Sequence, residues 1–444
     1  MKHLSKKDML FISLMLFSLF FGAGNLIFPP FLGQSAGTSL WPSMAGFILS
    51  AVGLPILGVV AVAKANGLHS LASRVHPFFS AIFTLIIYLA IGPLLGIPRA
   101  GSLAFEMGVS PFLSKDMNLT LALFIYTFVY FGLSYWLALS PSKLVDRFGK
   151  LLTPVILLLI LIIFVRALTH SFGAPALPTA DYAAMPFAKG FLDGYLTMDT
   201  IAALNFGIVI SLTLKQKGVS HSKQIVSYSI RAGLLAGLIL TLIYIMLGYL
   251  GAINHGTTEN GAQTLTQVVL TLFGSSGAII LGLVFSLACL TTSVGLITSC
   301  SQYFTTIIPK VKYRTWVTVI TGSSLVFANL GLTKILLISV PALTAIYPIA
   351  ITLIILTLLN DLFGGNRSVY ATTTLFVSIV SISDAFIQSG INLGPINTLV
   401  KSLPLYTFGF GWLVPAAIGV LIGLLIKILN KQQSFKKSQQ SKVS

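Results

Sequence analysis

Charge is scarce in this sequence of 444 residues, because Asp, Glu, Lys and Arg together make up only 8% of it. Hydrophobic residues make up 55%, and the stretch from residue 9 to residue 63 contains no charged residue at all. A soluble domain carries far more charge, so the composition excludes one. The apolar runs are long and continuous, which excludes the short alternating segments of a β-barrel. The sequence therefore predicts an all-α polytopic membrane protein.

The residue types that build catalytic and metal centres are also rare, with ten acidic residues, two cysteines and six histidines. Both cysteines, Cys289 and Cys300, fall in one apolar segment, so they predict neither a disulfide framework nor a metal site. The histidines lack the spacing of metal ligands, and no Ser, His and Asp group with a plausible pocket is apparent. We therefore do not expect an enzyme.

Basic residues outnumber acidic ones by 27 to 10, which gives a net charge of +17. Twelve apolar spans are predicted, and with a cytoplasmic N-terminus all but six Lys and Arg fall on the cytoplasmic side. This bias is typical of a membrane protein with both termini in the cytoplasm, so the charge indicates topology and not a nucleic-acid partner. The predicted spans are 8–31, 39–63, 78–104, 119–139, 149–168, 189–213, 226–250, 275–304, 314–330, 334–359, 368–388 and 405–429. The six outer residues are Arg99, Lys115, Arg166, Lys189, Lys334 and Lys401.

The spacing of the spans predicts an inverted repeat. Residues 1–168 hold five spans and residues 189–359 hold the next five, so the second block starts on the opposite side of the membrane. The first span of each block is also the interrupted one, which is the arrangement of many transporters. Residues 368–429 then form two accessory helices. Residues 430–444 form a polar, basic tail that we expect to be disordered, cytoplasmic and in contact with anionic lipid.

The first predicted span is interrupted by Gly22, Gly24, Pro29 and Pro30 within the uncharged stretch. Backbone groups freed in hydrocarbon are costly unless they are buried in protein or line a cavity. Glycine lets a ligand approach the backbone closely. The half-helix before the break presents carbonyls, which suit an ammonium or a cation, and the half-helix after it presents N–H groups, which suit a carboxylate. The break therefore predicts a zwitterion site without charged side chains. Its substrate-binding candidates are Gly22, Ala23, Gly24 and Asn25.

The sixth predicted span contains a polar patch at residues 193–200. Asp199 follows Lys189 by ten residues, or about 15 Å of helix, so we expect it near the middle of the membrane. An acidic group at that depth is a candidate to bind a cation, a proton or freed backbone amides. Alternatively, the helix begins late and Asp199 caps its first turn near the outer surface. With Tyr195 and Thr197, Asp199 completes the substrate-binding candidates.

The eighth predicted span carries a stripe of small or hydroxylated residues, Ala288, Thr291, Thr292, Gly295 and Ser299, on one helix face. One interpretation is close helix packing, for which small residues are the usual device. The other is that both threonine hydroxyls, together with carbonyls of the first span, coordinate a small hard cation. Sodium suits uncharged oxygen ligands of this kind.

Arg99 and Glu106 lie seven residues apart in the third predicted span, on one face near its outer end. We expect an interfacial ion pair of little consequence, with a part in an outer gate as the alternative.

At these residues the chain resembles the bacterial branched-chain amino acid:cation symporter family. The resemblance covers essentially the whole length and is carried by GAGNLIFPP at 22–30, FLDGYLTMDTIAAL at 191–204 and LACLTTSVGL at 287–296. The family is similar to the amino acid–polyamine–organocation superfamily, with a five-plus-five inverted-repeat core. The resemblance implies sodium-coupled import of leucine, isoleucine and valine across a bacterial cytoplasmic membrane.

The sodium-coupled leucine transporter fold is a more distant resemblance. Its Gly-x-Gly-Asn break in helix one matches the first break here, except that the Phe-Pro after the Asn comes one residue early. Its Ala-x-x-Thr-Ser stretch in helix eight matches the stripe, with Thr292 in place of Ser. The resemblance implies a sodium site made by the carbonyls of helix one and by helix eight. Its residues here are Ser18, Phe21, Ala288, Thr291 and Thr292.

Together these features predict a secondary active symporter that works by alternating access with Na⁺ as the coupling ion. The alternative is a proton- or sodium-coupled carrier of another small neutral solute, such as a nucleobase.

Overall fold

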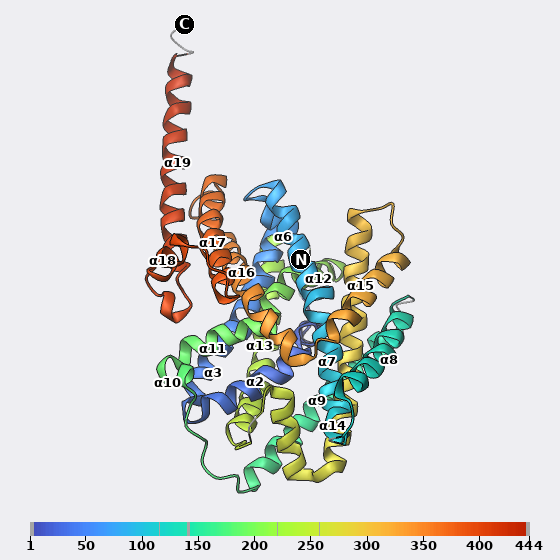
Figure 1. Ribbon diagram of the computed structural model, residues 1–444. Coiled ribbons are helices and arrows are strands. Elements are labelled where there is room, and N and C mark those ends of the chain that lie inside the picture. Colours follow the sequence, from blue (N-terminus) through green and yellow to red (C-terminus); the bar gives the residue numbers. More distant parts are fainter. Residues whose placement is uncertain (1–3, 115, 140–142, 220, 257, 441–444) are drawn as a thin grey trace.

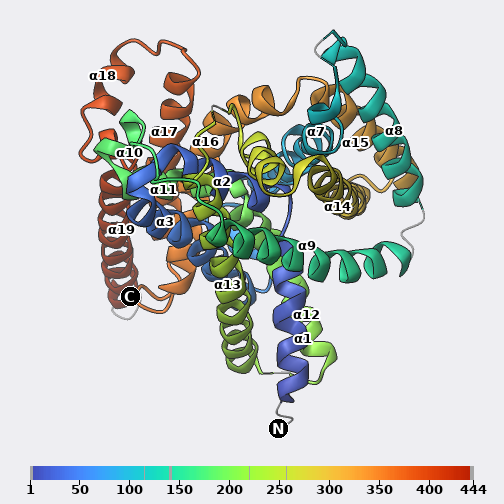
Figure 2. The same ribbon diagram turned by 90° about the horizontal axis from the view of Figure 1, so that it is seen from below.

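The protein is helical throughout the residues that the computed structural model describes, which are 4–114, 116–139, 143–219, 221–256 and 258–440. No strand occurs among them, which confirms the predicted all-α class. Figures 1 and 2 show helices gathered around α2 (Ala23–Ala36) and α13 (Ser222–Ala252). Every residue from 23 to 30 is buried, so the segment after the first break lies at the centre of the bundle.

Tight interruptions divide the helices in the first part of the chain. The π-helical turn η3 (Ala90–Leu94) contains Pro93, which has no N–H to donate, and Gly92, whose ψ of −122° is not helical. A second π-helical turn, η2 (Leu49–Gly53), joins α3 to α4. The helices here are α1 (Lys6–Phe20), α2, α3 (Leu40–Ile48), α4 (Leu54–Ala65), α5 (Leu68–Ser73), α6 (Pro77–Leu89), α7 (Gly96–Gly108), α8 (Leu119–Leu139) and α9 (Lys143–Thr169), with short 3₁₀ turns at Gly37–Ser39 and Ser110–Phe112.

The second part of the chain contains the longest helices. Gly274, with a φ of +65°, divides α14 into two stretches, and the predicted span there begins at the next residue. The helices are α10 (Ala180–Ala184), α11 (Pro186–Gly194), η5 (Tyr195–Thr197), α12 (Asp199–Gln216), α13, α14 (Gly261–Ile307), α15 (Tyr313–Ala328), α16 (Leu332–Leu358), α17 (Arg367–Gln388), α18 (Pro395–Lys401), η6 (Tyr406–Phe408) and α19 (Leu413–Gln440).

Eight helices of the described residues are long and apolar enough to cross a membrane. A ninth span results if Pro186–Thr197 and Asp199–Gln216, which are bent by 49°, count as one. Each of the twelve predicted ranges falls mainly on helix, but twelve crossings and the inverted blocks 1–168 and 189–359 stay predictions. The chain is a multi-pass membrane protein.

The C-terminal segment differs from the expectation of disorder. Helix α19 continues to Gln440, well past Asn430. Lys and Gln are good helix formers, so they extend a helix that the apolar span has already nucleated. Residues 441–444 lie outside the described residues.

Close packing between α2 and α13 depends on glycine. A Cβ on Gly33 would overlap the carbonyl of Gly248, and a Cβ on Gly251 would overlap the carbonyl of Pro30. The two helix backbones therefore touch along the second half of α2. This contact fixes the break against α13.

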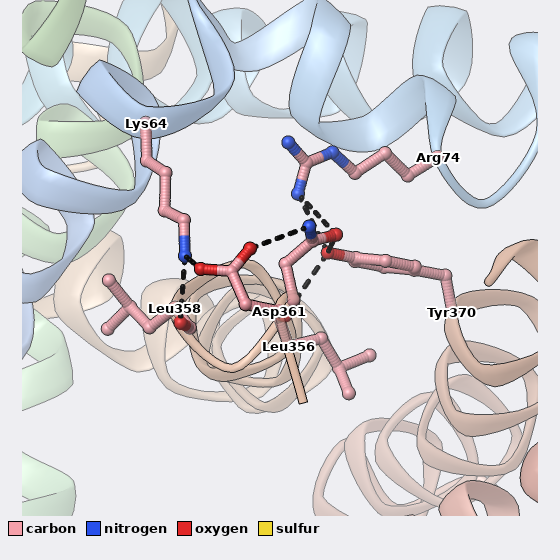
Figure 3. A network of polar contacts seen from close by, with 7 residues as sticks. Lys64, Arg74, Leu356, Leu358, Asp361 and Tyr370 are labelled. Atoms are coloured by element: carbon pink, nitrogen blue, oxygen red, sulfur yellow. Dashed lines mark hydrogen bonds and ion pairs between the residues drawn. The ribbon is translucent and has the colours of Figure 1, made fainter. Parts of the chain in front are cut away.

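A polar network ties the end of α4 to the turn between α16 and α17 (Figure 3). The Lys64 amino group lies 2.8 Å from the Asp361 carboxylate and donates to the carbonyl of Leu358 at 3.2 Å. Arg74 donates to the Tyr370 hydroxyl at 2.8 Å. Asp361 is largely exposed, so this network lies at the rim of the molecule, on the side predicted to be cytoplasmic.

Candidate functional site

The first break separates α1 from α2 by only two residues. Gly22 has extended backbone angles, and its N–H donates to Asn25 Oδ1 at 2.9 Å. In a continuous helix this N–H would donate to the carbonyl of Ser18 instead. The last carbonyls of α1 and the first N–H groups of α2 are therefore released from helical bonding at one point in the bundle.

The second break lies between α11 and α12, where η5 and Met198 interrupt the helix. Met198 has a φ of +66°, which is rare for a residue with a side chain and marks a backbone held by its surroundings. The Thr197 hydroxyl donates to the carbonyl of Gly194 at 2.9 Å and accepts the Asp199 N–H at 3.4 Å. Helix α12 then begins at Asp199.

The two breaks meet through a buried triangle of side chains. Asn25 Nδ2 donates to Asp199 Oδ2 at 2.6 Å, and the Tyr244 hydroxyl of α13 donates to the same oxygen at 3.2 Å. Asn25 and Tyr244 also contact each other. All three are buried. Helix α12 begins at Asp199, as the alternative interpretation has it, but Asp199 lies inside the helix bundle. Tyr244 was not predicted, because nothing local distinguishes a tyrosine in an apolar span.

Arg99 of α7 holds the second break. Its guanidinium donates to the carbonyl of Leu196 at 2.5 Å and to that of Thr197 at 3.4 Å, and it lies 5.4 Å from the centre of the Phe28 ring. A Cβ on Gly24 would come within 2.9 Å of Arg99 Nη2, so this glycine leaves room for the arginine. Arg99 is buried and lies close enough to Asp199 for the two charges to attract.

The predicted Arg99–Glu106 pair is wrong. Glu106 accepts from Gln263 Nε2 at 2.6 Å and from Asn260 Nδ2 at 3.4 Å. Seven residues correspond to about 10.5 Å along a helix, and each charge has a nearer partner on another element. Arg99 instead donates to the carbonyls of Leu196 and Thr197 at the second break.

Tyr195 takes a different direction from the other candidates of its span. Its ring stacks on Tyr347 of α16, with ring centres 4.2 Å apart. Its hydroxyl has no partner among the described residues. Thr197 and Asp199 lie in the junction of the two breaks, whereas Tyr195 faces α16.

The threonines of α14 lie beside the first break. Both hydroxyls, of Thr291 and Thr292, donate to the carbonyl of Ala288, at 2.8 and 3.0 Å, and each keeps lone pairs that a cation can use. A Cβ on Gly22 would lie 3.8 Å from Thr292 Cγ2. A Cβ on Gly295 would meet nothing within 4 Å, so close packing does not explain that position of the stripe.

The residues of the implied sodium site differ in exposure. Ser18 is exposed and Phe21, Thr291 and Thr292 are partly exposed, whereas the junction of the two breaks is buried. Helix α14 packs against α2 and α7, and α1 packs against α12 and α13. The two halves of the implied sodium site, on α1 and on α14, therefore lie on helices that pack chiefly against other elements.

Comparison with known proteins gives a consistent result. A family model described as branched-chain amino acid transport protein matches residues 5–430. The branched-chain amino acid permease BraB of Bacillus subtilis is 45% identical over 96% of this chain and 97% of its own. The branched-chain amino acid transport system 2 carrier protein of Pseudomonas aeruginosa is 41% identical over 96% and 97%.

Among solved structures, the inward-facing conformation of Mhp1 superposes with a TM-score of 0.60 at 16% identity, covering 94% of this chain and 91% of that one. MhsT in complex with L-phenylalanine gives 0.56 at 15% identity, covering 95% and 98%. At this identity the likeness concerns the fold, which is shared with these transporters. The family model and the relatives span nearly the whole length, and the chain therefore belongs to the branched-chain amino acid transport protein family.

Proposed function

We propose that this protein imports leucine, isoleucine and valine together with sodium, by symport and alternating access. The names of BraB and of the Pseudomonas carrier support the substrate class. The junction of the two breaks is the observation that carries the proposal, because it gathers released backbone groups in a buried region.

The substrate would bind at the first break. Its carboxylate would accept the free N–H groups at the start of α2, from Ala23 to Asn25, where the helix dipole favours an anion. Its ammonium would bind the carbonyls at the end of α1. Thr197 and Asp199 would border the ligand from the second break, with Asp199 as the negative charge closest to an ammonium. A ligand at this point would separate Asn25 from Asp199, which bond directly in this structure.

Sodium would bind the hydroxyls of Thr291 and Thr292 and the carbonyls of Ser18, Phe21 and Ala288. We expect these ligands to come together where the end of α1 lies against α14. Sodium would therefore favour the form in which these two helices lie together. This linkage would couple the ion to the substrate, because both bind to the half-helices of one break.

Leucine uptake into proteoliposomes tests the proposal. We expect uptake to require an inward sodium gradient, and equal rates with and without that gradient would contradict symport. Excess isoleucine or valine should compete with leucine, whereas competition by uracil would favour a nucleobase carrier.

The double variant T291V/T292V removes two hydroxyls with little change in volume. We expect the sodium concentration for half-maximal uptake to rise at least about tenfold, the effect of about 1.4 kcal/mol. The matched control is T305V/T306V on the same helix, whose hydroxyls donate to carbonyls of Ser301 and Tyr303 at 2.7 and 2.6 Å. An equal effect of both double variants would refute the assignment of the ion site.

A further inference from the structure

A second cavity lies apart from the junction of the two breaks. It has a volume of about 150 Å³ and lies between α11 with η5, α16, α17 and the segment before α19. Gln388 and Tyr406 belong to its lining, and neither α2 nor α7 contributes a residue to it. In Figure 2 the labels of α16, α17 and α11, which do contribute, lie near one another.

Three buried polar groups line this cavity without a partner among the described residues. They are the Tyr195 hydroxyl, the Ser381 hydroxyl and the Trp412 indole nitrogen. The three residues are only 4%, 2% and 7% exposed. Each group can donate a hydrogen bond, and the indole N–H can do nothing else. Buried donors are almost always satisfied, so three around one cavity indicate an acceptor such as a carboxylate.

A negative charge stands in the same cavity. Asp384 accepts from the Tyr406 hydroxyl at 2.9 Å and from Gln388 Nε2 at 3.2 Å, but it forms no ion pair among the described residues. A carboxylate that accepts two hydrogen bonds keeps lone pairs for an ammonium. The other carboxylate, of Asp193, already pairs with Lys189 at 2.6 Å. Asp384 is therefore the group that a cationic end of a ligand would bind.

Leu192, Leu343 and Val380 give the lining its aliphatic part. A cavity of about 150 Å³ encloses a molecule about the size of benzene, and because this cavity is partly open a somewhat larger ligand such as leucine can extend from it. Three donors, a carboxylate and aliphatic side chains around one cavity match a zwitterion with a short aliphatic side chain. We propose that this cavity is a second binding site for an α-amino acid of that kind, separate from the transport site.

A ligand there would act on the second break. Tyr195 belongs to η5, and the next residue, Leu196, also lines the cavity and accepts from Arg99 through its carbonyl. A carboxylate bound to the Tyr195 hydroxyl would contact η5 from this cavity, while Arg99 contacts it from α7. The ligand class is that of the proposed function, but the site and its residues are different.

Equilibrium binding of radiolabelled L-leucine to the purified protein tests the proposal. The protein would be placed in phosphatidylglycerol nanodiscs with sodium present, so that no lipid ammonium competes for Asp384. We expect two leucines per wild-type molecule. The variant S381A/W412F removes two donors, and D384N removes the charge, so each should weaken the second site at least tenfold and leave one leucine bound.

The matched control is W136F/S323A, which changes one exposed tryptophan and one half-buried serine outside the cavity and should still bind two leucines. A single leucine bound to the wild type, or two bound to both cavity variants, would overturn the proposal. Failure of the proposed function has a different signature, because no leucine would then be taken up or bound at the first break. N25A should lose that leucine and keep the one that S381A/W412F removes. Thermal unfolding of each variant verifies that it is folded.

Discussion

The two helix breaks hold their freed backbone in different ways. The neutral break, at residues 21–22, contains no charged side chain, and its Gly22 N–H is capped by the Asn25 amide. The charged break, η5 with Met198, has its carbonyls at Leu196 and Thr197 occupied by the Arg99 guanidinium. The backbone of the neutral break therefore bonds to an uncharged amide, whereas the carbonyls of the charged break bond to a guanidinium.

This difference indicates that the two breaks have different roles. A backbone site without charged side chains can bind and release a zwitterion, because no strong ion pair has to be broken. A buried charge is expensive, and it is kept where it fixes a conformation. We infer that ligands bind and leave at the neutral break, whereas the charged break determines the position of α12 relative to α2.

The largest effect is expected from R99M, which removes the charge but keeps a side chain of considerable length. Two buried carbonyls would lose their donor, and Asp199 would lose a nearby positive charge. Breaking such a buried network costs about 3–5 kcal/mol, so leucine uptake should fall more than about a hundredfold. The control is R166M in α9, where the arginine contacts only Thr169 among the described side chains. Near-normal uptake by R99M would show that the charged break does not need its charge.

A smaller loss is expected from D199N, which keeps the shape of the side chain. The amide oxygen can still accept from Asn25 and Tyr244, but without charge assistance. Hydrogen bonds to a charged group contribute about 1.5–3 kcal/mol, so uptake should fall by about ten- to a hundredfold. Initial rates of leucine uptake by D199N and by N25A, measured side by side, would show what each partner of the Asn25–Asp199 hydrogen bond contributes. If Asp199 also binds the substrate ammonium, D199N should raise KM for leucine more than it lowers the maximal rate.

A third change, G24A, adds one methyl group to α2, two residues after the neutral break. The new Cβ would stand 2.9 Å from Arg99 Nη2 and 3.1 Å from the carbonyl of Thr197. Overpacking of this kind costs about 1–3 kcal/mol, and uptake should fall about tenfold. G132A is the control, because a Cβ on Gly132 of α8 would meet nothing within 4 Å. Equal uptake by both variants would mean that the two breaks do not need to lie so close.

Sequence patterns identified both breaks, because glycine, proline and a polar patch in a charge-free span are local signals. They also placed the threonines of α14, whose hydroxyls share one face. The roles of Arg99 and Tyr244 could not be predicted in this way, since both depend on contacts between distant elements. The cavity beside η5 was missed for the same reason. Its donors come from η5, α17 and the segment before α19, and none of them forms a motif with the others.

The smallest effect is expected from the Lys64–Asp361 pair, which lies away from both breaks and serves as a reference for them. The hydrogen bond from Lys64, assisted by that from Asn360, lowers the pKa of the Asp361 carboxyl below its ordinary value. A carboxylate with a lowered pKa stabilises the fold above its unfolded-state pKa, and this contribution disappears as the pH falls through the lowered value. The melting temperature of the wild type should therefore exceed that of D361N by a constant small margin near neutral pH, and the margin should vanish in acid. K64M should lose the same margin and the hydrogen bond to the Leu358 carbonyl as well, and the loss in D361N/K64M should be smaller than the sum of the two single losses, because the pair is shared. Leucine uptake and its sodium dependence should stay unchanged in these variants, since an exposed pair contributes little and touches neither break. A change in sodium dependence would instead mean that the rim between α4 and α16 is part of the coupling, and that the comparison of the two breaks has to include it.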